Sequence, residues 1–267
     1  MDSKIEHLQE ISKEIRRLII EVANLSKSAH VGSSLSCVDL LSALYFKQLL
    51  IDETNWEARD IFVLSKAHAA MALYATLTRK GLIGEKQFLG YFQNEGTLPG
   101  HLDRLKGKGV EVSAGALGHG FNIALGMAHG YKLKNDKRRV YSIIGDGESM
   151  EGSIWEGAMF ASKLGIDNFT AFTDNNNLQG YGRTTQLCQF EPIVDKWKSF
   201  GWETFRVNGH DFSEILQALD APHQGKPKMI IADTVKGKGV SFMANELKWH
   251  YFIVTDELKE QALRELC

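Results

Sequence analysis

The chain has 267 residues, and 31 Lys and Arg against 33 Asp and Glu give it a formal net charge of −2 at pH 7. Hydrophobic residues make up 43% and charged residues 24%, which excludes a disordered chain. The near-neutral charge, without any block of Lys and Arg, excludes a protein that binds nucleic acid through electrostatics. The length suits one large α/β domain over residues 1–267.

The three cysteines, Cys37, Cys188 and Cys267, are odd in number and widely spaced, which favours neither a disulfide framework nor a zinc site. No apolar stretch approaches the length of about 18 residues that a membrane span needs. The N-terminus is charged from its start, unlike a signal peptide. These features predict a cytoplasmic enzyme or enzyme subunit.

Apolar residues recur every three or four positions near the N-terminus and predict an amphipathic helix over about residues 3–28. A second helix is predicted over 38–50, with Ser36 as its N-cap. Short apolar runs then predict buried strands at 61–64, 140–144, 169–173 and 229–232. Helix-like stretches alternate with them at 69–80, 119–134, 152–163 and 211–220. This alternation predicts a three-layer α/β/α fold around a mostly parallel sheet.

Two polar segments, residues 145–152 and 174–179, follow neighbouring predicted strands. Either segment alone reads as an ordinary turn, because Gly, Asp and Asn are the usual turn residues. Together they offer the Asp146 carboxylate, the Asn176 amide oxygen and the Leu178 carbonyl, which are the hard oxygens that Mg²⁺ combines with phosphates. Glycines and a helix N-terminus favour close approach of an anion. The pair therefore predicts a metal–diphosphate site at the carboxyl edge of the sheet.

The sequence Gly-Asp-Gly at 145–147, with Asn-Asn at 175–176, resembles the fingerprint of proteins that bind thiamin diphosphate (ThDP). Most of the chain resembles the N-terminal, diphosphate-binding half of transketolases. The matching motifs follow in order at 29–32 (AHVG), 64–68 (LSKAH), 99–101 (PGH), 109–120, 209–212 (GHDF), 236–239 (KGKG) and 249–250 (WH). An ordered set of this kind is far more specific than one Gly-Asp-Gly motif.

The resemblance implies that Asp146, Asn176 and the Leu178 carbonyl hold Mg²⁺, or another divalent cation such as Ca²⁺ or Mn²⁺, and that Gly147 contacts the diphosphate. It also implies two further groups of cofactor contacts, one near the aminopyrimidine from Gly115, Ala116 and Leu117, and one from His68, Lys236 and His250. The cofactor is thus expected to lie between the strand ends and these loops.

The resemblance further implies that His30, His101 and His250 surround the reacting carbon and the sugar hydroxyls. Imidazole suits this task, because it exchanges protons near neutral pH. Glu151 is expected between subunits, where the family uses a carboxylate to link paired active sites. His210 lies in a matching motif, but turn packing explains it equally well.

Four positions depart from the usual family residues: Val31 and Leu102 replace Pro, and Ala67 and Tyr251 replace Gly. Loss of Pro removes a fixed φ angle, and Tyr251 adds bulk near the substrate channel. None of the four removes a ligand of the ion or of the diphosphate. We therefore expect intact cofactor binding, whereas the four departures leave the choice of substrate open.

A transketolase made of one chain is more than twice this length and carries a second α/β domain that binds the aminopyrimidine. The resemblance therefore implies the N-terminal subunit of a split transketolase, which forms an α2β2 heterotetramer with a separate pyrimidine-binding subunit. The chain would be active only with that partner. The reaction would transfer a two-carbon ketol unit from a ketose to an aldose, with sugars or sugar phosphates as substrates and ThDP as the electron sink.

Three alternatives differ from this interpretation in the motifs that they require. The α subunit of a 2-oxo-acid dehydrogenase or decarboxylase shares the Gly-Asp-Gly and Asn-Asn motifs but would lack the histidines of the SKxH, PGH and WH motifs. An inactive scaffold subunit would be indicated by loss of Asp146 or Asn176, and both are present. A nicotinamide-binding Rossmann protein would carry GxGxxG after its first strand, which this chain does not.

Overall fold

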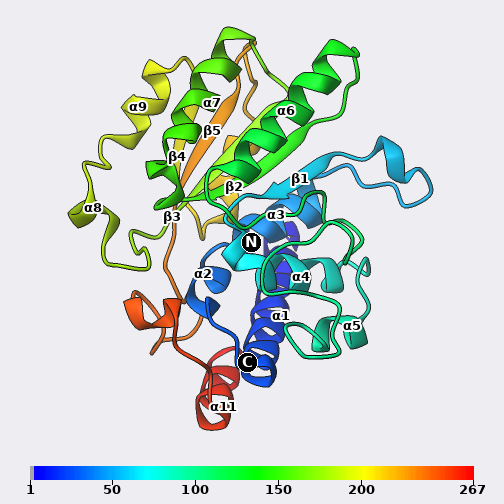
Figure 1. Cartoon of the computed structure of the whole chain (residues 1–267), viewed down its shortest axis with the longest axis vertical. Helices are drawn as coiled ribbons and strands as arrows, with labels where there is room; N and C mark the ends of the chain where they lie inside the picture. The colour runs from blue at the N-terminus through cyan, green and yellow to red at the C-terminus, as the bar shows by residue number, and fades with distance from the viewer. Residues whose placement is uncertain (1–2) are drawn as a thin grey trace.

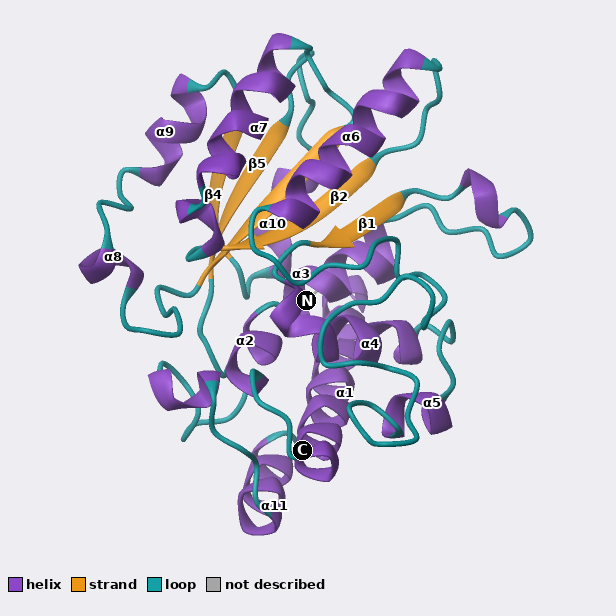
Figure 2. Cartoon of the chain, in the orientation of Figure 1, coloured by secondary structure: helices purple, strands orange, loops and turns teal. Residues whose placement is uncertain are grey.

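The computed structural model describes residues 3–267, and its centre is a parallel sheet of five strands in the order β1-β2-β3-β5-β4. Figure 2 shows this sheet in orange. Its strands are β1 (Ile61–Leu64), β2 (Val140–Gly145), β3 (Phe169–Asn175), β4 (Glu203–Asn208) and β5 (Lys228–Asp233). The predicted α/β fold with a parallel sheet is confirmed.

Helices cover both faces of the sheet, because successive side chains of a buried strand point to opposite faces and each face must be covered. One face packs on α1 (Ser3–Ser26), α2 (Val31–Ser36), α3 (Val38–Ala43), α4 (Ala70–Arg79) and α10 (Phe212–Asp220). The other face packs on α6 (His119–Leu133), α7 (Gly152–Lys163) and α9 (Ile193–Ser199). The remaining helices are α5 (Glu85–Leu89), α8 (Thr184–Leu187) and α11 (Asp256–Glu265), as Figure 1 shows.

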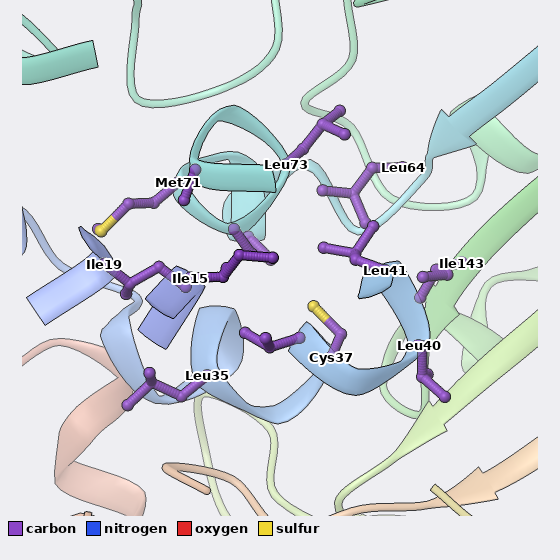
Figure 3. Close-up of a cluster of buried hydrophobic side chains, with 14 of the residues drawn as sticks. Ile15, Ile19, Leu35, Cys37, Leu40, Leu41, Leu64, Met71, Leu73 and Ile143 are labelled. Carbon is purple, nitrogen blue, oxygen red and sulfur yellow. The ribbon is translucent and has the colours of Figure 1, made fainter. Parts of the chain in front are cut away.

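The first face holds the larger hydrophobic cluster, in which α1 lies against the segments that follow it. Figure 3 shows Ile15 and Ile19 of α1 beside Leu41 of α3 and Met71 of α4. Cys37 lies within this cluster, and burial raises the pKa of its thiol to about 11. This thiol therefore packs as a small apolar group.

The predicted helix over 38–50 is correct in position but not in its cap or its last turn. Ser36 ends α2, and its Oγ donates to Asp174 Oδ2 at 2.6 Å, so it does not cap α3. Cys37 stands at the N-cap position, and α3 continues as a π-helical turn over Leu44–Gln48. The Ser36 prediction was wrong, because Ser36 is itself the last residue of α2 and the N-cap position of α3 falls on Cys37.

The four predicted strands and the helices over 69–80, 119–134, 152–163 and 211–220 are confirmed within one or two residues. The fifth strand, β4, was not predicted. It lies at the edge of the sheet and mixes buried, half-buried and exposed residues, so it has no continuous apolar run. Among residues 3–267, no helix combines the length and apolar character needed to cross a bilayer.

Candidate active site

The predicted metal–diphosphate segments lie side by side, because β2 and β3 are neighbours in the sheet. Gly145 at the end of β2 pairs with Asp174 of β3, so Asp146 and Asn176 leave the sheet at the same edge. A cavity of about 640 Å³ opens there. Its lining includes most of the predicted site residues: His68, His101, Gly115, Leu117, Asp146, Gly147, Glu151, Asn176, Leu178 and His250. His30, Ala116 and Lys236 do not line it, although His30 and Lys236 contact residues that do.

Asp146 is a buried carboxylate whose direct partners are neutral. Its side chain is 3% exposed and accepts hydrogen bonds from the Gly147 amide and the Thr184 hydroxyl, each at 2.8 Å. Burial raises the pKa of Asp146 above its usual range. A divalent cation beside this carboxylate would offset the cost of burying its charge, so the residue fits the metal role.

The Asn176–Leu178 turn presents the other two oxygens of the expected metal site. The Leu178 amide donates to Asn176 Oδ1 at 3.1 Å, and Asn177 adopts a left-handed φ of 57° that turns the chain sharply. Leu178 O accepts from Lys236 Nζ at 3.0 Å, which leaves one of its lone pairs for an ion. In the described part of the chain, no cluster of three or more His, Cys, Asp or Glu side chains is arranged to hold a metal. One carboxylate, one amide and one carbonyl form the hard-oxygen set that suits Mg²⁺ or Ca²⁺.

Gly147 and Glu148 shape the loop that follows β2. A Cβ on Gly147 would lie 2.9 Å from the Gln179 side chain, so only glycine fits without displacing that side chain. The buried Glu148 carboxylate accepts from the amides of Gly118 at 2.9 Å and Gly145 at 3.1 Å. It also accepts from the Ser65 hydroxyl. Sequence reasoning missed Glu148, although it adjoins the Gly-Asp-Gly motif.

Beneath the metal ligands lies a buried ion pair between Lys66 and Asp174, which sequence reasoning also missed. Lys66 Nζ donates to Asp174 Oδ2 and, at 2.9 Å, to the Ser33 carbonyl. Burial would raise the pKa of Asp174, but the Lys66 ammonium and the surrounding hydrogen bonds hold it below its usual range. The same pair holds the pKa of Lys66 above its usual value despite burial. Both groups are therefore ionised, and Asp174 has a counter-ion of its own.

Four histidines from distant segments meet beside the cavity. The ring centroids of His30 lie 5.0 Å from His250, 5.5 Å from His68 and 6.1 Å from His101. The backbone helps to fix this cluster, because the His30 amide donates to the His250 carbonyl at 2.9 Å and His30 adopts a left-handed φ of 68°. The structure thus brings together all four histidines that the motifs singled out.

Burial keeps three of these histidines uncharged near neutral pH. Desolvation, with nearby His101 and the cations Lys236 and Lys66, lowers the pKa of His30 to about 4. Burial and Lys236 lower the pKa of His250 to about 3, and burial holds the pKa of His68 well below its usual value. A neutral imidazole can accept a proton from a hydroxyl group, so the cluster can act in proton transfer.

Lys236 connects the histidine cluster to the metal ligands. Its Nζ lies 3.0 Å from Leu178 O, 3.0 Å from His250 Nδ1 and 3.1 Å from Ser33 Oγ. Because an ammonium only donates, Nδ1 of His250 is the acceptor and the ring proton lies on Nε2. Burial and Lys66 lower the pKa of Lys236 to about 8.

Of the four departures from the usual family residues, only Tyr251 lines the cavity. Val31 is buried at the start of α2, and Ala67 is buried in a short 3₁₀ turn after β1. Leu102 is also buried, and its carbonyl accepts from the Ala114 amide at 3.1 Å. These three side chains therefore contribute to interior packing, whereas the Tyr251 side chain adjoins the site itself.

Comparisons with known proteins identify the family of the chain. Residues 7–264 match the family described as "Transketolase, thiamine diphosphate binding domain". The chain is 42% identical to the 6-deoxy-6-sulfo-D-fructose transketolase subunit SqwG of Clostridium sp. (strain MSTE9), with 97% of this chain and 96% of that one covered. It is 38% identical to one subunit of the apulose-4-phosphate transketolase of Phocaeicola vulgatus, over 98% and 95% of the two chains.

Longer relatives match over less than half of their length. The human transketolase is 32% identical, and the match covers 98% of this chain but 42% of the human protein. The crystal structure of transketolase from Campylobacter jejuni superimposes with a TM-score of 0.88 at 29% identity, over 98% of this chain and 43% of that one. By its family match, its near end-to-end relatives and its fold, the chain belongs to the transketolase family, as a thiamin diphosphate-binding domain.

Proposed function

We propose that the chain is the N-terminal subunit of a ThDP-dependent transketolase that transfers a two-carbon ketol unit from a ketose to an aldose. The observation that carries this proposal is that oxygens suited to a metal ion and uncharged histidines adjoin the same cavity. The oxygens of Asp146, Asn176 and Leu178 occupy the strand ends, and the neutral histidines adjoin them. ThDP, when bound, supplies the electron sink that carbon–carbon bond cleavage next to a carbonyl needs.

The protein's own residues would bind and orient the cofactor at the sheet edge. Asp146, Asn176 and the Leu178 carbonyl would hold Mg²⁺ or a similar cation between the chain and the diphosphate. The Gly147 backbone would contact the diphosphate, with His68 and Lys236 nearby as polar and cationic partners. Gly115, Ala116 and Leu117 would line the aminopyrimidine side of the site.

The histidines would donate protons to the oxygens of the sugar and accept protons from its hydroxyl groups. His250 has its Nδ1 occupied by Lys236, so its Nε2 proton is free to meet a substrate oxygen. His30 is uncharged at neutral pH and can accept a proton from a hydroxyl group. His101 is exposed at the cavity wall, where its imidazole can reach a bound sugar.

A separate subunit would complete the site. Relatives that are named as one subunit of a transketolase match this chain almost from end to end, whereas transketolases of greater length match over about two fifths. We assign pyrimidine binding to a partner chain and propose an α2β2 assembly. Glu151, exposed at the start of α7 and on the cavity wall, would face the boundary between subunits.

The test is a ketol-transfer assay on this chain co-purified with a pyrimidine-binding subunit encoded beside it. The donor panel should contain fructose 6-phosphate, 6-deoxy-6-sulfofructose and apulose 4-phosphate, because two of the relatives are named for the last two sugars. We expect turnover that requires ThDP and Mg²⁺ and that is absent in the Asp146→Ala complex. Oxidative or non-oxidative decarboxylation of a 2-oxo acid, without ketol transfer, would instead favour the 2-oxo-acid dehydrogenase or decarboxylase alternative.

A further inference from the structure

Tyr251 stands at the mouth of the cavity, directly beside the histidine cluster. Its ring centroid lies 4.6 Å from that of His250 in an edge-to-face arrangement and 6.1 Å from that of His30. The residue lines the cavity and is nevertheless 59% exposed. A molecule that enters from solvent toward these two histidines therefore passes this ring.

Contacts near the backbone and at the hydroxyl group fix the position of the Tyr251 side chain. Next to its backbone, the carbonyl of the preceding residue, His250, accepts from the His30 amide at 2.9 Å. At the hydroxyl end, Tyr251 Oη packs directly on Gly180, where a Cβ would lie only 2.5 Å from that oxygen. Gly180 belongs to the loop that carries the Leu178 carbonyl. Tyr251 thus extends from the histidine cluster to the metal-ligand loop, along one edge of the cavity.

The neighbouring aromatic residue has a different environment. Phe252 packs against Trp249, with ring centroids 5.7 Å apart, and it is not among the residues that line the cavity. Of these two adjacent aromatic side chains, only Tyr251 can therefore touch a substrate on its way to the histidines.

We propose that Tyr251 determines substrate specificity, because its ring narrows the cavity beside His250 and His30 and so favours aldehyde acceptors with short carbon chains. This inference rests on the proposed transketolase function and specifies its substrate class. The ring presents apolar bulk, and its hydroxyl is packed on the protein rather than turned to the substrate. A longer aldose must displace the ring or bind in a bent form, and either cost lowers kcat/KM for that substrate.

The experiment compares two acceptors in the co-purified complex, glyceraldehyde 3-phosphate with three carbons and ribose 5-phosphate with five. The measured quantity is the ratio of their kcat/KM values with one common donor. We expect Tyr251→Gly to raise the five-carbon to three-carbon ratio by about tenfold or more, since a few buried groups in a pocket discriminate to that extent. Tyr251→Phe keeps the bulk, so its ratio should stay within about twofold of wild type. Phe252→Ala is the matched control and should leave the ratio unchanged.

Gly180 provides an independent way to move the same ring. Gly180→Ala places a methyl group against Tyr251 Oη, so the ring must shift and the ratio must change. In the Tyr251→Gly background the same alanine meets only His250 Nε2, at an ordinary contact distance of 3.5 Å, and should have no further effect. This non-additivity separates a contact with Tyr251 from a general disturbance of the loop. ThDP affinity of each variant complex shows whether the metal ligand Leu178 has moved as well.

An unchanged ratio in an active Tyr251→Gly complex would overturn the proposal. Loss of all turnover in that variant, with ThDP still bound, would also overturn it, because Tyr251 would then serve the chemistry rather than the choice of substrate. A wild-type complex that binds ThDP but transfers no ketol unit between any donor and acceptor would refute the proposed function instead.

Discussion

His210 Nδ1 donates to Asp39 Oδ2 at 2.7 Å, and this contact joins α3 to the turn between β4 and α10. Arg16 of α1 donates to both oxygens of Asp39, at 2.9 and 2.7 Å. On its other side, His210 Nε2 accepts the backbone N–H of Val235 at 2.8 Å. Because Val235 precedes Lys236, a continuous chain of buried and partly buried contacts leads from the first helix to Lys236.

We expect His210→Leu to lower the free energy of unfolding by about 2–4 kcal/mol, because it leaves the Val235 N–H unpaired and takes one partner from a buried carboxylate. His210→Gln should lose less than half as much, since an amide can donate to Asp39 and accept from Val235. Urea unfolding of the purified chain measures both values. Equal losses in the two variants would mean that ring packing, rather than the paired hydrogen bonds, is what His210 contributes.

Asp39 should make stability depend on pH in the acid range. Burial would raise its pKa, but Arg16 and the hydrogen bond from His210 outweigh burial and hold the pKa well below the usual range. The folded state therefore binds this proton more weakly than the unfolded state, so the stabilisation is present above about pH 4 and is lost as the pH falls below it. The difference in unfolding free energy between wild type and Asp39→Asn should shrink when urea titrations move from about pH 7 to about pH 3. A difference that stays constant with pH would contradict the ionised pairing.

Asp146→Ala should abolish detectable binding of ThDP in the presence of Mg²⁺. Loss of a residue that only supports a metal ligand costs about 10–100-fold in affinity, so loss of a carboxylate ligand should cost at least the upper value. Calorimetric titration of the complex with ThDP and Mg²⁺ provides the measurement. Asp167→Ala, which removes a half-exposed carboxylate paired with Lys132, is the control. Affinity unchanged by Asp146→Ala would remove the central assignment of the metal site.

His101→Ala should reduce turnover of the complex by about 10²–10⁴-fold, the usual contribution of general acid–base catalysis. ThDP affinity should shift little, because diphosphate binding is assigned to the ion, the glycine backbone, His68 and Lys236. Steady-state kinetics and ThDP titration separate the two effects. His7→Ala, an exposed histidine of α1, is the matched control. Loss of ThDP, with normal turnover in the remaining holoenzyme, would make His101 a cofactor ligand instead.

The chain without its partner should show no ketol transfer, because the domain that completes the aminopyrimidine site is assigned to the other subunit. The purified chain, supplied with ThDP, Mg²⁺ and the donor panel, should yield no product above the rate without protein, and the partner should restore turnover. Measurable transfer by the chain alone would contradict the two-subunit interpretation.

The sheet and the position of Asp146 and Asn176 at one of its edges could be predicted from sequence because both depend on local signals. Apolar runs marked β2 and β3, and two βα turns in neighbouring strands necessarily lie at one edge. The ion pair of Lys66 and Asp174 could not be predicted in this way, since the residues are far apart in sequence and a Lys after a strand usually faces solvent. Likewise, no spacing rule places His30 beside His250. That contact depends on how the loops after α1 and before α11 fold over the sheet edge.

Predictions from sequence failed for individual residues and for one strand where a tertiary contact outweighed a local preference. Ser36 is a good N-cap by type, yet its hydroxyl bonds to Asp174 in the buried layer below the site. Several residues of β4 are exposed because β4 is an edge strand, and its edge position cannot be recognised before the strand order is known. Family motifs indicated which residues meet, whereas the hydrogen bonds that hold them in place required the structure.

The strand register has a kinetic consequence for cofactor loading. Asp146 and Asn176 extend from β2 and β3, and β3 is flanked on both sides by paired strands, with Asp174 aligned to Gly145 on one side and to Ala232 on the other. Segments buried this deeply open only in global unfolding, so their amides should be among the slowest to exchange with solvent. The strand ends that lead into Asp146 and Asn176 are consequently fixed in place before any ion arrives. Saturation with cofactor should therefore proceed at a rate set by entry into the cavity, without a slow folding step around the metal.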